Sequence, residues 1–126
     1  MWFINKGIAP NFRFYNRNGT LRPIPIIVLV RDNSIAWVQP SGAGKQYFRF
    51  LPGLTNTNQY ALRDGKAEAT FAGCSDQNSM YGSGLTEFYI GVIVRGPRCI
   101  TLDVRTTAIR QPIPARLTFG KCGSGN

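Results

Sequence analysis

Apolar and polar positions alternate in short segments along the chain, and this alternation predicts β-strands. Residues 100–105 read Ile-Thr-Leu-Asp-Val-Arg, so every second side chain is apolar. Because successive side chains of a strand point to opposite faces of its sheet, one face of this strand should be buried and the other hydrated. Residues 115–119 repeat the pattern, and we expect Leu117 and Phe119 to face inward.

Other segments are rich in the β-branched and aromatic residues that strands favour. They are residues 24–30, 35–38, 47–51, 67–71 and 87–94. A cluster of turn-forming residues separates the first two segments, so we expect residues 24–38 to form a hairpin. Residues 24–30 are almost entirely apolar, which is typical of a strand covered on both faces.

Signals for helices are nearly absent. The chain contains 14 Gly and 8 Pro, and their spread leaves few stretches in which a helix could run without interruption. With a less certain N-terminal segment (residues 1–22), the pattern amounts to about seven or eight short strands. A length of 126 residues suits one domain. The sequence predicts an all-β, single-domain β-sandwich over residues 1–126, immunoglobulin-like or similar, with a frayed tail at 123–126. A small β-barrel is the alternative.

The three cysteines all lie at the ends of predicted strands, where a disulfide can join neighbouring elements. A zinc site is not expected, because the chain has no histidine and no Cys-x-x-Cys pair. Three pairings are possible, and we expect the bridge Cys74–Cys99, which leaves Cys122 free or intermolecular. The alternative is three buried free thiols in a reducing compartment.

Four segments around these cysteines occur in a fixed order. They read Phe-Ala-Gly-Cys at 71–74, an apolar strand at 88–94, Gly-Pro-Arg-Cys at 96–99 and Phe-Gly-Lys-Cys at 119–122. This set resembles a group of small actinobacterial proteins of unassigned activity that are made with a signal peptide or a lipoprotein leader. The resemblance runs from about residue 24 to residue 122. It implies an exported β-domain with cysteines at these positions, and it implies no activity.

The N-terminus shows no leader of its own. Residues 1–6 (Met-Trp-Phe-Ile-Asn-Lys) have neither a charged start nor an apolar core. The longest apolar run, residues 24–30, is far shorter than the ~20 residues of a membrane helix. Because of the cysteines, we expect an extracytoplasmic protein, secreted or at the cell surface, whose leader was removed before Met1.

The net charge is +9, and it is concentrated in the first half of the chain. Such a surface suits an anionic wall polymer, a lipid headgroup or an acidic protein. The candidate anion-binding residues are Arg13, Arg17, Lys45 and Arg49. Arg49 stands among aromatic residues, so the alternative is a barrel that binds single-stranded nucleic acid by stacking bases on Tyr47, Phe48 and Phe50. We expect instead that Phe48 and Phe50 pack in the core.

The composition argues against most catalytic machinery. Without histidine, the Ser-His-Asp and Cys-His mechanisms are excluded. The six acids form no catalytic motif, and Asp64 and Glu68 are interpreted as a turn residue and an outward strand residue. Residues 41–46 (Ser-Gly-Ala-Gly-Lys-Gln) imitate a phosphate-binding loop, but Gln46 replaces its Ser or Thr and a strand follows. We expect a non-catalytic structural or binding module without a metal or cofactor. The sequence predicts no particular oligomeric state.

Overall fold

In the residues that the structure describes, the regular structure consists of short strands and two 3-10 helices. The computed structural model describes residues 1–4, 12–51, 53, 58–109 and 111–122, so the predicted frayed tail lies outside the described residues. The strands are β1 (Trp2–Ile4), β2 (Ile24–Arg31), β3 (Ile35–Pro40), β4 (Phe48–Leu51), β5 (Ala69–Ala72), β6 (Asn78–Ser79), β7 (Gly82–Ser83), β8 (Leu85–Val94), β9 (Arg98–Thr106) and β10 (Ile113–Phe119). The 3-10 helices are η1 (Gly42–Gln46) and η2 (Leu62–Asp64). Within the described ranges, no helix has the length and apolarity that crossing a membrane requires.

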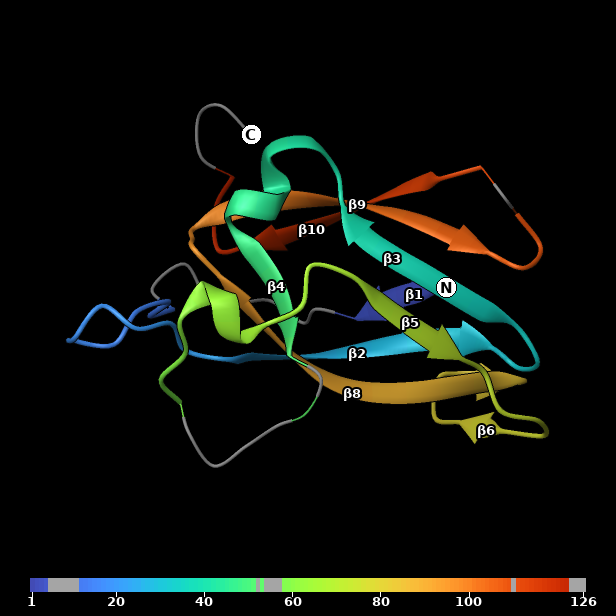
Figure 1. The fold of residues 1–126 in the computed structure, drawn as a ribbon. Helices are drawn as coiled ribbons and strands as arrows, with labels where there is room; N and C mark the ends of the chain where they lie inside the picture. The colour runs from blue at the N-terminus through green and yellow to red at the C-terminus, as the bar shows by residue number, and fades with distance from the viewer. Residues whose placement is uncertain (5–11, 52, 54–57, 110, 123–126) are drawn as a thin grey trace.

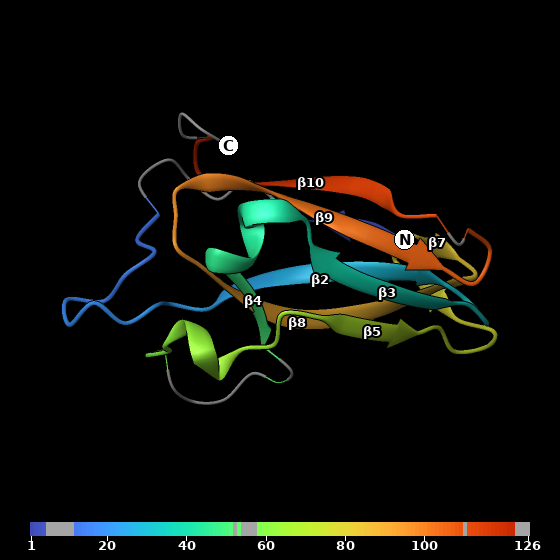
Figure 2. The ribbon, with the colours of Figure 1, turned by 45° about the horizontal axis from the view of Figure 1, so that its top comes forward.

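The strands form two antiparallel four-stranded sheets that lie face to face (Figure 1). The order is β1-β2-β8-β4 in one sheet and β10-β9-β3-β5 in the other, with β6 and β7 in a small separate hairpin. Figure 2 shows the β10-β9-β3-β5 sheet lying over its partner. The predicted all-β sandwich is therefore confirmed. Both strand orders are open in the part of the chain that the structure describes, so the alternative of a small closed barrel is wrong.

The turn after β2 carries the chain from one sheet to the other. β2 pairs with β8, whereas β3 pairs with β9, so the hairpin predicted for residues 24–38 is wrong. The two strands bury their inner side chains, such as Val30 and Ala36, in the same core. Because β2 and β3 face each other across the core, each covers the apolar face of the other. If they paired side by side in one sheet, both apolar faces would need another layer to cover them.

The core lies between the inner faces of the two sheets. The predicted inward side chains are all buried there: Ile100, Leu102, Val104, Leu117 and Phe119. Phe48 and Phe50 are buried as well and pack edge to face, with ring centroids 4.8 Å apart. A second, smaller cluster, Leu21, Leu51, Tyr60 and Ile93, covers one end of the outer face of β4 and β8.

A disulfide joins Cys99 at the start of β9 to Cys122 just after β10, with their Cα atoms 4.9 Å apart. Cys99 lies opposite Thr118 in the β9–β10 register, so the chain beyond β10 needs only a short return to reach it. The predicted pairing of Cys74 with Cys99 is therefore wrong. Cys74 is the exposed free cysteine, and its carbonyl accepts a hydrogen bond from the Asn33 N–H in the β2–β3 turn at 3.1 Å.

One buried polar group ties the loop after β5 to the sandwich. Thr86 on β8 is 5% exposed. Its hydroxyl donates to the Asp32 carboxylate at 2.8 Å and accepts from the Cys74 N–H at 2.9 Å. The second carboxylate oxygen of Asp32 accepts from the Gln77 N–H at 2.8 Å. Asp32 therefore has a structural role, because it satisfies a buried hydroxyl and a loop amide together.

Candidate functional site

The predicted anion-binding residues lie in two separate places. Arg17 lies inside the segment closed by the Tyr15–Leu21 bridge, and Arg13 lies two residues before that segment, which projects from one end of the sandwich in both ribbon views (Figures 1 and 2). Lys45 lies on η1 and Arg49 on β4. The Arg49 guanidinium donates to the backbone carbonyl oxygens of Lys45 and Phe48, so the Arg49 side chain lies against the backbone of η1.

The aromatic residues beside Arg49 do not form a stacking surface. Phe48 and Phe50 point into the core. The ring of Tyr47 lies under the Arg98 guanidinium, whose central carbon is 3.4 Å from the ring centroid. Two of the three rings that a nucleic-acid strand would need are thus withdrawn from the surface.

The segment that imitates a phosphate-binding loop forms η1 and leads into β4 rather than into a long helix. The loop therefore offers no α-helix N-terminus to a phosphate. Asp64 accepts a hydrogen bond from the Ala61 N–H at 2.8 Å and caps η2. Glu68 instead lines a groove elsewhere on the surface, so the two acids serve different places.

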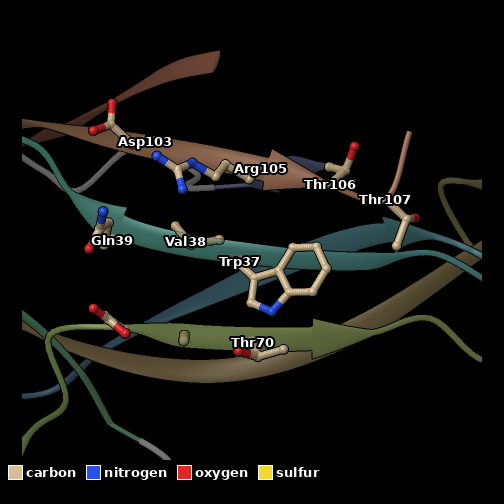
Figure 3. Close-up of a pocket in the computed structure, with 10 residues that line it drawn as sticks. Trp37, Val38, Gln39, Thr70, Asp103, Arg105, Thr106 and Thr107 are labelled. Carbon is tan, nitrogen blue, oxygen red and sulfur yellow. The ribbon is translucent and has the colours of Figure 1, made fainter. Parts of the chain in front are cut away.

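This groove, which we call the Trp37 groove, lies on the outer face of β3, β5 and β9 (Figure 3). Its volume is about 530 Å³, inside the range of small-molecule sites. The lining residues are Trp37, Val38, Gln39, Glu68, Ala69, Thr70, Asp103, Arg105, Thr106 and Thr107. None of these residues is among the anion-binding candidates predicted from the sequence.

Strand alternation explains why these side chains share one face. Val38 of β3 points into the core, so its neighbours Trp37 and Gln39 point outward. On β9, Leu102 and Val104 are buried, so Asp103 and Arg105 point outward in the same way. The residues that each strand buries thus determine which of its side chains are exposed.

Register brings the outward side chains together in two rows across the sheet. In one row, Trp37 pairs with Thr70 of β5 on one side and with Arg105 of β9 on the other. In the next row, Gln39 pairs with Asp103, and Glu68 precedes β5 on the opposite side of β3. Figure 3 shows the indole nitrogen of Trp37 turned toward β5 and the Arg105 side chain running along β9 toward Asp103.

Most polar side chains of the groove make no hydrogen bond inside the protein, although the hydroxyls of Thr106 and Thr107 accept from backbone N–H groups. Among the described residues, the side chains of Trp37, Gln39, Glu68, Asp103 and Arg105 have no hydrogen-bond or ion-pair partner. Three of the other four acids differ, since Asp32, Asp64 and Glu87 each accept hydrogen bonds that hold a loop. The groove therefore collects polar side chains whose bonding capacity is open to a ligand.

The arrangement has the parts of a recognition surface. Trp37 is 44% exposed and offers a flat apolar ring at the middle of the sheet. Carboxyl, amide, guanidinium and hydroxyl groups line the same groove, so it offers both hydrogen-bond donors and acceptors. No group of three or more metal-ligating side chains occurs in the part of the chain that the structure describes.

Comparison with known proteins finds no matching family model, no matching curated protein and no matching solved structure.

Proposed function

We propose that the protein is a non-catalytic, extracytoplasmic binding module whose ligand lies in the Trp37 groove. The observation that carries this proposal is the exposed indole of Trp37 in one groove with Gln39, Glu68, Asp103 and Arg105, whose side chains have no partner among the described residues. Ligand sites combine an apolar surface with a few converging polar groups, and this groove has both. A half-exposed Trp also leaves apolar surface in contact with water, and a ligand that covers this surface is favoured by the hydrophobic effect.

Binding suits the groove better than catalysis. Its two carboxyl side chains are Glu68, which is exposed, and Asp103, which is half-buried. The chain also has no histidine to serve as a general base. The groove residues are therefore assigned to ligand contact.

The placement outside the cytoplasm is supported by the cysteines. The Cys99–Cys122 bridge ties β10 to β9, and structural disulfides persist in oxidising compartments. The resemblance of the cysteine-containing segments to exported proteins supports the same placement.

The basic surface forms a separate part of the proposal. Lys45 and Arg49 could contact an anionic wall polymer, lipid headgroup or acidic protein, but they lie outside the groove lining. No observation favours the alternative of a single-stranded nucleic-acid binder, since Phe48 and Phe50 lie in the core.

A screen by nuclear magnetic resonance tests the proposal and does not require a named ligand. The ¹⁵N-labelled protein is mixed with a general library of small soluble fragments, and the shifted signals are mapped. We expect hits to move the indole N–H signal of Trp37 and the backbone signals of Gln39 and Arg105. The indole signal of Trp2, which is 48% exposed on the other sheet, should stay in place. A library that leaves the Trp37 signal unmoved, or moves both indoles alike, contradicts the proposal.

A further inference from the structure

We infer that the ligand of the Trp37 groove is a neutral saccharide, with one sugar ring stacked on the indole of Trp37. This inference rests on the proposed function, because it names the chemical class that the same groove takes. It is carried by the combination of a flat aromatic surface, a mixed set of donors and acceptors, and the signs of the charges around the ring.

The indole supplies a flat, apolar surface on an interior strand of the sheet. Trp37 stands on β3, which has β9 on one side and β5 on the other, so strands hold its backbone on both sides. A pyranose ring has C–H groups on its faces and hydroxyls around its edge. The C–H face can cover the exposed part of the indole and remove apolar surface from water.

The rim of the groove matches the edge of a sugar. Each sugar hydroxyl both donates and accepts hydrogen bonds. Arg105 supplies donors, Asp103 and Glu68 supply acceptors, and Gln39 and Thr70 supply both kinds. Since Trp37 pairs with Arg105 and Gln39 pairs with Asp103, these groups flank one ring position.

The charged side chains of the groove favour a neutral ligand over an ionic one. A phosphate or carboxylate in the groove would meet the carboxyl groups of Glu68 and Asp103. An ammonium ion would meet the guanidinium of Arg105. A neutral polyhydroxyl ligand bonds with both kinds of group and places no like charges together. The groove thus differs from the rest of a chain with net charge +9, on which an anion has better sites.

Calorimetric titration with defined sugars tests the inference. The probes are cellotetraose, maltotetraose and the fully N-acetylated chitotetraose, all of them uncharged, and each is added to the intact, oxidised protein. We expect at least one to bind with a Kd of about 1 mM or tighter. The affinity should stay the same when salt is raised, because the ligand is uncharged. Chromatography of the recovered probe should show it intact.

Variants assign the binding to the groove. Trp37→Ala should weaken binding at least about tenfold, and Trp37→Phe, which keeps a ring, should weaken it less. The matched control is Trp2→Ala, which removes a similarly exposed indole on the other sheet and should leave the affinity unchanged. Circular dichroism of each variant confirms the fold, and both Trp side chains are exposed enough for replacement.

Three outcomes overturn the inference. One is that no sugar of the set binds although fragments bind at Trp37, in which case the groove is a ligand site of another class and the proposed function stands. Another is that spermidine, and no sugar, binds in a Trp37-dependent way, which identifies a cationic ligand. The third is a sugar affinity that Trp37→Ala leaves unchanged. Failure of both fragments and sugars at the groove removes the proposed function as well.

Discussion

Trp37 on β3 lies directly opposite Arg105 on β9, and Thr70 on β5 is its partner on the other side. The backbone of Trp37 therefore lies between Arg105 and Thr70 on the outer face of one sheet, and the Arg105 side chain runs from there toward Asp103 (Figure 3). The three residues are far apart in sequence, and only the strand order places them in one row. A ligand that covers the ring should meet both flanking groups.

Removing the guanidinium should weaken ligand binding without unfolding the protein. A hydrogen bond to a charged group contributes about 1.5–3 kcal/mol, so we expect Arg105→Ala to raise the Kd of the sugar probe about ten- to a hundredfold. Arg63→Ala serves as the control, because Arg63 is exposed on η2 outside the groove. Calorimetry that finds the two variants equally affected, or Arg105→Ala unaffected, would count against the assignment of Arg105.

Adjacent residues of β9 should differ sharply in their effect on stability. Leu102 is fully buried, so Leu102→Ala should lower the free energy of unfolding by about 2–5 kcal/mol. Asp103 has no internal partner among the described residues, so Asp103→Ala should change it by less than about 0.5 kcal/mol. Urea unfolding followed by circular dichroism measures both. Similar losses at the two positions would mean that the strand does not alternate as described.

Much of the fold follows from local patterns. The predicted strands at 24–30, 35–38, 87–94, 100–105 and 115–119 all occur, because one-sided burial requires the period-two alternation that the sequence shows. The hairpin predicted at 24–38 does not occur. A turn between two apolar strands fits a hairpin and a crossing between sheets equally well, and only the pairing of β3 with β9, over sixty residues away in sequence, decides between them.

The candidate site was less accessible to sequence reasoning. Alternation with Val38 and Leu102 was enough to place Trp37 and Asp103 outward. What local patterns lack is the register that brings Trp37 to Arg105, because it joins residues from distant segments. The cysteine pairing failed for the same reason. Cys99 comes close to Cys122 only through the β9–β10 register, which places Cys99 opposite Thr118.

The disulfide should stabilise the fold, and the free thiol should not. Closing a loop of sequence separation 23 contributes about 3 kcal/mol in the chain-entropy account, so Cys122→Ser should lose about that much. Cys74→Ser should be nearly neutral, because the Cys74 contacts to Asn33 and Thr86 are made by its backbone. Urea unfolding measures the difference.

A thiol titration checks the same pairing independently. The unreduced, denatured protein should release one thiol, and peptide mapping should place it at Cys74. Three thiols, or a bridge that contains Cys74, would contradict the structure.

Protonation of Glu87 at low pH should weaken the hydrogen bonds that hold the loop around β6. Hydrogen bonds from the Ser79 hydroxyl, then the Tyr89 hydroxyl and the Met80 N–H, hold the pKa of Glu87 below its ordinary value of 4.5. A depressed pKa gives stability that is present above the unfolded value and lost as pH falls through the folded value. We expect the Met80 amide signal to titrate with a midpoint below 4.5 and Glu87→Gln to abolish that titration. A midpoint at or above 4.5 would contradict the contact.

The hydroxyl of Tyr89, which donates to Glu87, should lose its proton at a higher pH than an ordinary tyrosine. The Tyr89 hydroxyl donates to Glu87 at 2.6 Å, and this hydrogen bond, with the nearby negative charge, raises the pKa of Tyr89 above its ordinary value of 10.0. The contribution of a raised pKa is present below the unfolded value and lost as pH rises through the folded value. Glu87→Gln should bring the pKa of the tyrosine back toward 10.0, as followed by ultraviolet absorbance against Tyr89→Phe.

The most direct measurement of ligand contact at Trp37 is acrylamide quenching of its fluorescence. Trp2→Phe leaves Trp37 as the sole indole, since the chain has two Trp residues. The tightest ligand from the fragment and sugar sets is then added to saturation. Because the ligand covers a ring that is 44% exposed, we predict that the quenching constant falls. A quenching constant that stays the same at saturation would show that the ligand binds elsewhere and would contradict the account.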